Sequence, residues 1–237
     1  MKIIHFILYI IKTFLIIFIG LIYLIVATIA RFFSKWISKK VFTKYLDLYF
    51  KLFNINVQFE YSDNKLKEAR NTVFILLNQY SFLDSMVVPM IPTRKTLGII
   101  NIEMGLYPVL GWFYLLTNYV IVRQWSNQAK NTLNKTNNFL KSGGNISMSI
   151  EGKRSKNGIL NEYKKGPVVM AINAQADIVP FIIEGTFELL PYGSLYAKSG
   201  DIKVKLLDKI STKECLYKDR NEMIKKLLIV AKKNGLK

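Results

Sequence analysis

Eighteen consecutive uncharged residues, 13–30, lie near the start of this chain, and most of them are apolar. As a helix, such a run is just long enough to cross about 30 Å of hydrocarbon. If the helix continues back through Lys12, whose ammonium can reach the membrane surface, the segment spans the bilayer with some tilt. A cleaved secretory signal ending at Ala30 is the alternative, but the apolar stretch is longer and more interrupted than a signal core. We therefore expect an uncleaved membrane anchor.

The basic residues around this run are distributed unevenly. Two lysines precede it and a heavier cluster follows it: Lys2 and Lys12, then Arg31, Lys35, Lys39 and Lys40. Because positive charge is retained on the cytoplasmic side of membranes, the body of the protein is expected on that side.

Residues 31–54 alternate aromatic residues with lysines. Five apolar side chains recur there at helical spacing: Tyr45, Leu46, Tyr49, Phe50 and Phe53. This composition is typical of a helix lying in the membrane interface. An amphipathic helix packed on the domain that follows has the same periodicity. With either alternative, residues 1–54 are predicted as membrane-anchoring helices that precede a compact domain.

The chain combines apolar with strongly basic character. Its residues are 51% hydrophobic, and 34 Lys and Arg against 16 Asp and Glu leave a net charge of +18. Since anionic lipid attracts each nearby basic side chain by about 1 kcal/mol, membrane lipid is the expected partner. The alternative explanation of the positive charge is that this sequence simply uses lysine as its ordinary polar residue. No nucleic acid is expected, because the basic residues are scattered and no nucleic-acid-binding module is recognisable.

Cysteine and histidine are almost absent. Cys215 is the single cysteine, so no intrachain disulfide is possible, and His5 is the single histidine and lies in the first apolar run. A zinc site built on histidines is therefore excluded, and no metal site is predicted.

Residues 55–237 have the pattern of an α/β domain. Seven short apolar runs are separated mainly by longer polar or periodic stretches, of which 129–141, 162–176 and 221–233 are expected helices. Strands that alternate with helices predict a mostly parallel sheet with flanking helices. The expected strands start at positions 55, 72, 96, 119, 145, 178 and 202.

Polar residues follow the run 73–77 directly, where function collects in open α/β sheets. Asn78 and Gln79 come first, and Ser81 and Asp84 follow. Five residues apart, Gln79 and Asp84 lie about 140° apart on a continuous helix, so they meet only if a helix begins after a turn at Ser81. Ser81 and Asp84 also fit a capping box, which is the structural explanation for Asp84.

Two further apolar runs end in unusual polar residues. Arg123 follows the run at 119, and the run at 145 ends in EGKRS, Glu151 to Ser155. Gly152 permits an unusual backbone angle or the close approach of a ligand. Arg154 offers a planar fork suited to phosphate. A solvated strand end and a charged turn are the plain alternatives for these two segments.

In order and spacing, these segments resemble the motifs of the glycerophospholipid acyltransferases, the family typified by 1-acyl-sn-glycerol-3-phosphate acyltransferase. NQYSFLD (78–84) matches N-H-x-x-x-x-D except for Gln79, and 107–124 supplies Pro108, Gly111 and Arg123 of the second motif. SIEGKRS (149–155) matches F-P-E-G-T-R-S with Ile150 and Lys153 substituted, and IVPFII (178–183) matches the fourth motif. The resemblance covers about residues 71–184.

The resemblance implies a reaction and a set of roles. The family's histidine takes the proton from the hydroxyl of a lysophospholipid such as lysophosphatidic acid, which attacks the thioester of acyl-CoA or acyl carrier protein, and the aspartate orients the imidazole. No cofactor beyond this acyl donor is implied. Catalytic positions fall on Gln79 and Asp84. Substrate-binding positions fall on Asn78, Arg123, Glu151, Gly152, Lys153, Arg154 and Ser155, with the two arginines clamping phosphate and Lys153 and Lys164 adding positive potential.

Gln79 changes what this site can do. Its amide reaches about as far as an imidazole and can donate to Asp84, but it has no useful basicity. Loss of the general base costs on the order of 10²–10⁴ in rate. One hypothesis is a membrane-associated acyltransferase of phospholipid biosynthesis or remodelling with impaired catalysis. The alternative is a lipid-binding or scaffold protein, a pseudoenzyme on the same fold. A basic peripheral membrane protein that merely shares the fold is a third, weaker one.

Overall fold

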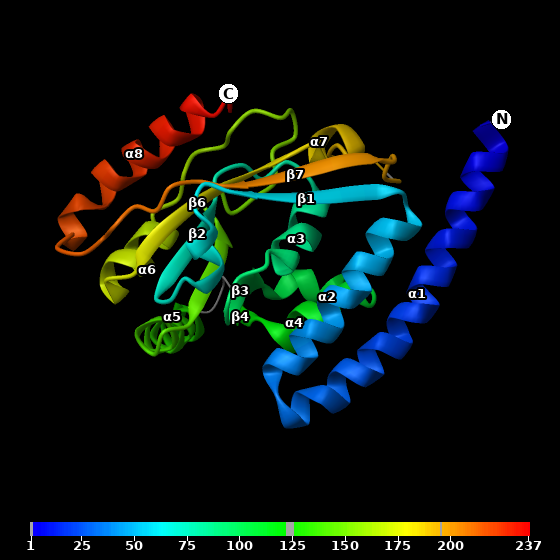
Figure 1. Ribbon diagram of the computed structural model, residues 1–237, viewed down its shortest axis with the longest axis horizontal. Helices are drawn as coiled ribbons and strands as arrows, with labels where there is room; N and C mark the ends of the chain where they lie inside the picture. The colour runs from blue at the N-terminus through cyan, green and yellow to red at the C-terminus, as the bar shows by residue number, and fades with distance from the viewer. Residues whose placement is uncertain (1, 122–125, 195) are drawn as a thin grey trace.

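A mixed seven-stranded sheet forms the centre of the structure, a computed structural model that describes residues 2–121, 126–194 and 196–237 (Figure 1). The strand order is β1-β7-β6-β2-β5-β3-β4. All seven predicted strands are confirmed. They are β1 (Ile55–Tyr61), β2 (Thr72–Leu76), β3 (Thr96–Asn101), β4 (Tyr119–Ile121), β5 (Asn145–Ser149), β6 (Asp177–Glu184) and β7 (Gly200–Leu206).

Five neighbouring strands, β6, β2, β5, β3 and β4, run parallel. The sheet reverses only between β6 and β7, and β1 pairs with β7 in parallel. The mostly parallel sheet expected from the sequence is therefore confirmed. Since the five parallel strands end at the same edge, the loops that follow β2, β5 and β6 lie together there.

Helices cover both faces of the sheet (Figure 1). One face carries α2 (Lys35–Leu52), α3 (Phe82–Val87) and α4 (Leu110–Thr117), and the other carries α5 (Ser126–Lys141), α6 (Gly166–Ala174) and α8 (Arg220–Lys233). The short α7 (Thr186–Leu189) follows β6. Each face has its own apolar cluster, around Phe74 and Phe181 on the first face and around Ile75 and Ile182 on the second. Strand residues that alternate between the two clusters explain why these runs are almost wholly apolar.

The expected helix 162–176 begins later than the sequence suggested, at Gly166. Pro167 occupies its first turn, where the missing amide hydrogen costs nothing. The residues just before it hold a different position, because Asn161 donates both its backbone and its side-chain N–H to Glu151. The predicted helical start at residue 162 was therefore wrong.

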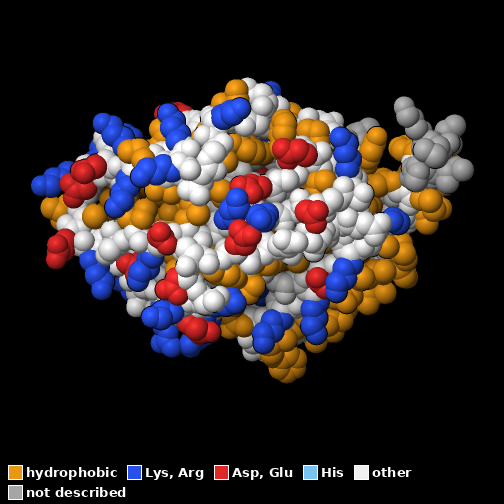
Figure 2. Space-filling view, turned by 45° about the horizontal axis from the view of Figure 1, so that its top comes forward, with side chains coloured by type: hydrophobic (Ala, Val, Ile, Leu, Met, Phe, Trp, Pro, Cys, Tyr) orange, Lys and Arg blue, Asp and Glu red, His pale blue; other side chains and the backbone are white. Residues whose placement is uncertain are grey.

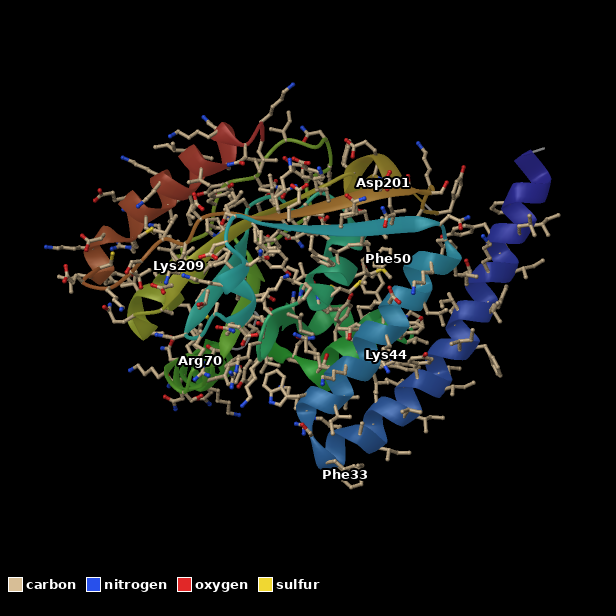
Figure 3. All side chains as sticks on the ribbon, viewed as in Figure 1. Phe33, Lys44, Phe50, Arg70, Asp201 and Lys209 are labelled. Atoms are coloured by element: carbon tan, nitrogen blue, oxygen red, sulfur yellow. The ribbon has the colours of Figure 1, made fainter. Side chains whose placement is uncertain are left out.

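The N-terminal helices form a hairpin on the first face. Helix α1 (Lys2–Phe33) lies along α2, and its segment Phe6–Phe33 is long and apolar enough to cross a membrane. The two helices share the core of the domain: Tyr45 of α2 donates its hydroxyl to the carbonyl of Ile16, and Ala27 of α1 is fully buried. Figure 3 shows Phe33 at the turn between them.

The apolar face predicted on residues 31–54 is buried in the domain. Tyr45, Leu46, Phe50 and Phe53 are at most 6% exposed, and Phe50 lies on the side of α2 turned toward the sheet (Figure 3). Of the two alternatives, the amphipathic helix packed on the domain is therefore confirmed. The outer face of α1 is the exposed apolar surface instead, and Figure 2 shows it as a continuous band along one edge of the molecule.

Candidate active site

A cavity of about 860 Å³ lies between the sheet and the helices α3 and α4. Its floor is made by small residues of β3 and β5, Gly98, Ser147 and Ser149, where the neighbouring β2 has Phe74 and Leu76 on the same face. The space exists because small side chains replace large ones at these positions. Residues from two of the segments singled out in the sequence line it: Gln79, Ser81 and Asp84 of the first, and Gly152 to Arg154 of the other.

Asp84 is buried and its carboxylate accepts three hydrogen bonds. As the sequence predicted, the chain turns at Ser81 and α3 begins at Phe82 with a capping box. Oδ2 of Asp84 accepts from the amides of Tyr80 (2.7 Å) and Ser81 (2.8 Å), and Oδ1 accepts from Thr186 Oγ1 (2.6 Å). The capping role is therefore confirmed, and a residue a hundred positions away completes it.

Burial dominates the electrostatics of the two carboxylates beneath the cavity. Loss of solvent raises the pKa of Asp84 to about 6, although its hydrogen bonds to Thr186, Ser81 and Tyr80 oppose the rise. Burial also raises the pKa of Glu151, against the hydrogen bonds from Asn161 and Gln79. The negative charge of Glu151 adds to the rise at Asp84.

Gln79 lies at the cavity wall, but its side chain does not engage Asp84. Among the described residues Gln79 makes no side-chain hydrogen bond to Asp84, and its Oε1 is buried with no partner. The hydrogen bond that the sequence allowed between these two side chains is therefore not formed, and three other donors bind the Asp84 carboxylate instead. An orphaned buried oxygen costs about 1–3 kcal/mol.

The backbone of Gln79 is held from both sides by the third motif. Its amide donates to Glu151 Oε1 (2.9 Å), and its carbonyl accepts from the amide of Ser155 (2.7 Å). Glu151 and Ser155 are buried behind the cavity wall, so they fix the position of Gln79 rather than line the cavity. This arrangement ties the end of β2 to the loop after β5.

The side chain of Asn78 also binds neighbouring backbone rather than facing the cavity. Its side-chain amide donates to the carbonyl of Ile183 (2.7 Å) and accepts from the amide of the same residue (3.0 Å). The side chain thus continues the β2–β6 pairing two residues beyond Leu76 and lies outside the cavity lining.

The exposed part of the third motif carries the positive charge of the site. Gly152 adopts a positive φ of 68°, a backbone angle that few other residues tolerate. Lys153 is exposed, and the guanidinium of Arg154 lies 5.2 Å from the ring centre of Tyr192, over its face. Lys164 is paired with Glu162 at 2.7 Å on the surface.

Only part of the second motif lies within the described residues. Gly111 packs so closely on the preceding turn that a Cβ atom there would lie 2.3 Å from the carbonyl oxygen of Met104. This glycine therefore serves the packing of α4. Arg123 lies in 122–125, outside the described residues.

Three residues near the site were not singled out as site residues in the sequence. Thr186 follows β6 and is fully buried, Tyr192 lies in the loop after α7, and Lys39 of α2 lines the cavity. A polar residue directly after a strand was the available clue for Thr186. Lys39 was counted among the basic residues that flank the membrane anchor.

Comparisons with known proteins agree with this architecture. The family model for acyltransferases matches residues 56–184. The chain is 28% identical over 163 residues to the 1-acyl-sn-glycerol-3-phosphate acyltransferase of Limnanthes douglasii, covering 68% of this chain and 57% of that protein. It is 30% identical over 159 residues to 1-acyl-sn-glycerol-3-phosphate acyltransferase beta of Homo sapiens, covering 66% and 57%.

A solved structure shares the fold over almost the whole chain. The crystal structure of the 1-acyl-sn-glycerophosphate acyltransferase PlsC from Thermotoga maritima superimposes with a TM-score of 0.73 at 21% identity, covering 96% of this chain and 92% of that one. The family model spans more than half of this chain and includes all four motif segments and most of the cavity wall. The chain therefore belongs to the acyltransferase family.

Proposed function

We propose that this protein is a membrane-associated acyltransferase that transfers an acyl chain from a thioester donor to a lysophospholipid, with lysophosphatidic acid as the acceptor class. The observation that carries the proposal is the cavity. Gln79 and Asp84 of the first motif and Gly152 to Arg154 of the third line one space, whose remaining walls are mostly apolar. A polar end and an apolar body suit a substrate with the same two parts.

The two ends of the substrate have separate places. The acyl chain lies along the small residues of β3 and β5 under α3 and α4. The acceptor phosphate lies at the third motif, where Arg154 supplies a planar fork and Lys153 a second positive charge. The thioester of acyl-CoA or acyl carrier protein then meets the acceptor hydroxyl beside Gln79.

Catalysis at this site is slow in our proposal, because no base stands where the acceptor hydroxyl must lose its proton. The Gln79 amide does not take up a proton near neutral pH. Asp84 is already an acceptor of three hydrogen bonds, so it is poorly placed to remove a proton from an alcohol. The general-base contribution, about 10²–10⁴ in rate, is lost.

The membrane is reached through the N-terminal hairpin. Helix α1 exposes a long apolar face, with Phe14 at 70% and Phe18 at 63% exposure, while its other face is packed on α2 and α4. Because the ring of Tyr9 near its start contacts the rings of Phe53 and Tyr196, α1 is attached to the domain along its length. We propose that α1 lies in one leaflet with the domain beside it, and that the basic residues hold the protein to the cytoplasmic surface.

A second candidate function has its own observation. The Gln79 Oε1 atom is buried without a partner, while the backbone contacts that shape the site are intact. A site that is preserved in shape but lacks its base suits a protein that binds lysophospholipid or acyl-CoA without turning it over.

The experiment that separates these functions compares the protein as written with its Gln79→His variant. Both are assayed with acyl-CoA and with acyl carrier protein thioesters on lysophosphatidic acid in vesicles, with thiol release and product mass as readouts. Transfer by both proteins supports the enzyme, with the variant faster. Binding of both substrates with transfer only in the variant supports the binding protein. Failure of Gln79→His to transfer any acyl chain to any lysophospholipid would overturn the proposal.

A further inference from the structure

A lysine reaches the cavity from the N-terminal hairpin. Lys39 of α2 lines the cavity, and its Nζ atom donates to the carbonyl oxygen of Thr96 at the start of β3. In the described part of the chain, the ion pairs do not include Lys39. An ammonium group has three donors, so this contact leaves two of them for other partners.

The strand register places Lys39 at the far end of the cavity from the motif residues. Thr96 pairs with Asn145 at the start of β5, while Ser149 ends β5 just before the third motif. Four residues of strand correspond to about 13 Å. Ser147 lies between these ends, on the cavity floor.

The ammonium of Lys39 is costly to leave unpaired. Burial lowers the pKa of Lys39 to about 8, so the group still carries its charge at neutral pH. Water that fills the inner end can satisfy the spare donors. A plain hydrocarbon chain long enough to reach Lys39 displaces that water and supplies no hydrogen-bond acceptor for the ammonium. A chain with an oxygen atom at that point accepts a hydrogen bond from it.

We infer that Lys39 determines which acyl chains the cavity takes: it favours chains that carry an oxygen function near the end that reaches it, and it disfavours plain chains of the same length. The inference rests on the proposed function, since it assumes that the cavity holds the acyl chain. It assigns a substrate class to the inner end of the cavity, the end remote from the acceptor site. Lys39 acts here on specificity, because the register places it far from the reacting thioester.

The test measures binding, so that it does not depend on turnover. The full-length protein in lipid nanodiscs is titrated calorimetrically with acyl-CoA thioesters of increasing chain length and with their ω-hydroxy counterparts. The variants are Lys39→Met, which keeps the length of the side chain without donors, and Lys39→Arg, which keeps the donors. Lys40→Met is the matched control, because Lys40 is the neighbouring lysine and is exposed. Thermal unfolding of each variant establishes that it is folded.

The expected result is that the ratio of the affinities for hydroxylated and plain chains depends on Lys39. At the chain length that reaches the lysine, the protein and the Lys40→Met control bind the hydroxylated chain about ten- to a hundred-fold more tightly than the plain one. Lys39→Arg retains this preference, and Lys39→Met loses it and binds the longer plain chains better. An unchanged ratio in folded Lys39→Met would overturn the inference while the proposed function stands. Absence of binding by every acyl-CoA, together with failure of Gln79→His to transfer a chain from either donor, would overturn both.

Discussion

Thr186 Oγ1 donates a 2.6 Å hydrogen bond to Oδ1 of Asp84, from a position 102 residues later in the chain. The amides of Tyr80 and Ser81 occupy Oδ2 of the same carboxylate. The aspartate of the first motif therefore joins the turn after β2 to the residue that follows β6. A carboxylate has about four acceptor sites, and three hydrogen bonds leave one of them open on Asp84. An imidazole N–H could donate to that site.

Replacing Asp84 by alanine should destabilise the fold, because it leaves three buried donors without an acceptor. We expect Asp84→Ala to lower the free energy of unfolding by about 3 kcal/mol or more. Asp84→Asn should cost far less, since its amide oxygen can accept both backbone N–H groups and the Thr186 hydroxyl can turn to accept from its amide nitrogen. Urea unfolding of both variants measures the difference. Equal stabilities for the two variants would contradict this role.

The raised pKa of Asp84 gives a pH dependence with a definite sign. Burial holds the folded-state pKa at about 6, above the ordinary value of 3.8, so the folded protein binds this proton more tightly than the unfolded chain. The contribution to stability is complete below about pH 4 and is lost as the pH rises through about 6, and it amounts to about 3 kcal/mol. Unfolding free energies of the protein and of Asp84→Asn, at about pH 4.5 and about pH 7, isolate it. A protein that gains stability relative to the variant over this range would show the opposite sign.

Gln79→His should restore the missing base. The introduced imidazole has an acceptor available on Asp84, and the backbone at this position is already fixed by Glu151 and Ser155. We expect the rate of acyl transfer to rise by about 10²–10⁴-fold and its pH profile to show a new inflection at about pH 6.5. The measurement is the pH profile of thiol release from acyl-CoA in the presence of lysophosphatidic acid. Gln79→Asn is the matched control, because it alters the side chain without adding a base, and a similar gain there would contradict the assignment.

The strands and the capping turn were predictable because their signals are local. An apolar run that is buried on both faces reads as a strand, and Ser81 with Asp84 reads as a capping box within four residues. The partners that complete the site come from elsewhere. Thr186 meets Asp84 only because β2 and β6 are neighbours in the sheet, and the strand order does not follow from the sequence. The lysines of residues 31–54 are alike in sequence, and only the packing of α2 places Lys39 in the cavity.

Tyr192 should position Arg154 for the acceptor phosphate. The guanidinium lies 5.2 Å from the ring centre, and a contact of this kind is worth about 0.5–1 kcal/mol at an exposed site. We expect Tyr192→Ala to raise KM for lysophosphatidic acid about two- to five-fold with kcat unchanged, because only the bound position of the arginine is loosened. Tyr192→Phe keeps the ring and should retain the original KM. Steady-state kinetics in the Gln79→His background supplies the signal, and a fall in kcat alone would contradict a positioning role.

The exposed face of α1 should dominate membrane attachment. Phe14 and Phe18 of α1 are 70% and 63% exposed. Withdrawing one such ring from lipid costs about 1.5–3 kcal/mol, so each change to serine should weaken vesicle partitioning about ten- to a hundred-fold. Sedimentation with vesicles measures it, and anionic lipid at low salt should recover part of the loss through the basic residues. Ile229→Ser is the control, since Ile229 is also exposed but lies on α8, against the opposite face of the sheet. Equal losses from Ile229→Ser and Phe18→Ser would show that α1 is not the surface in contact with lipid.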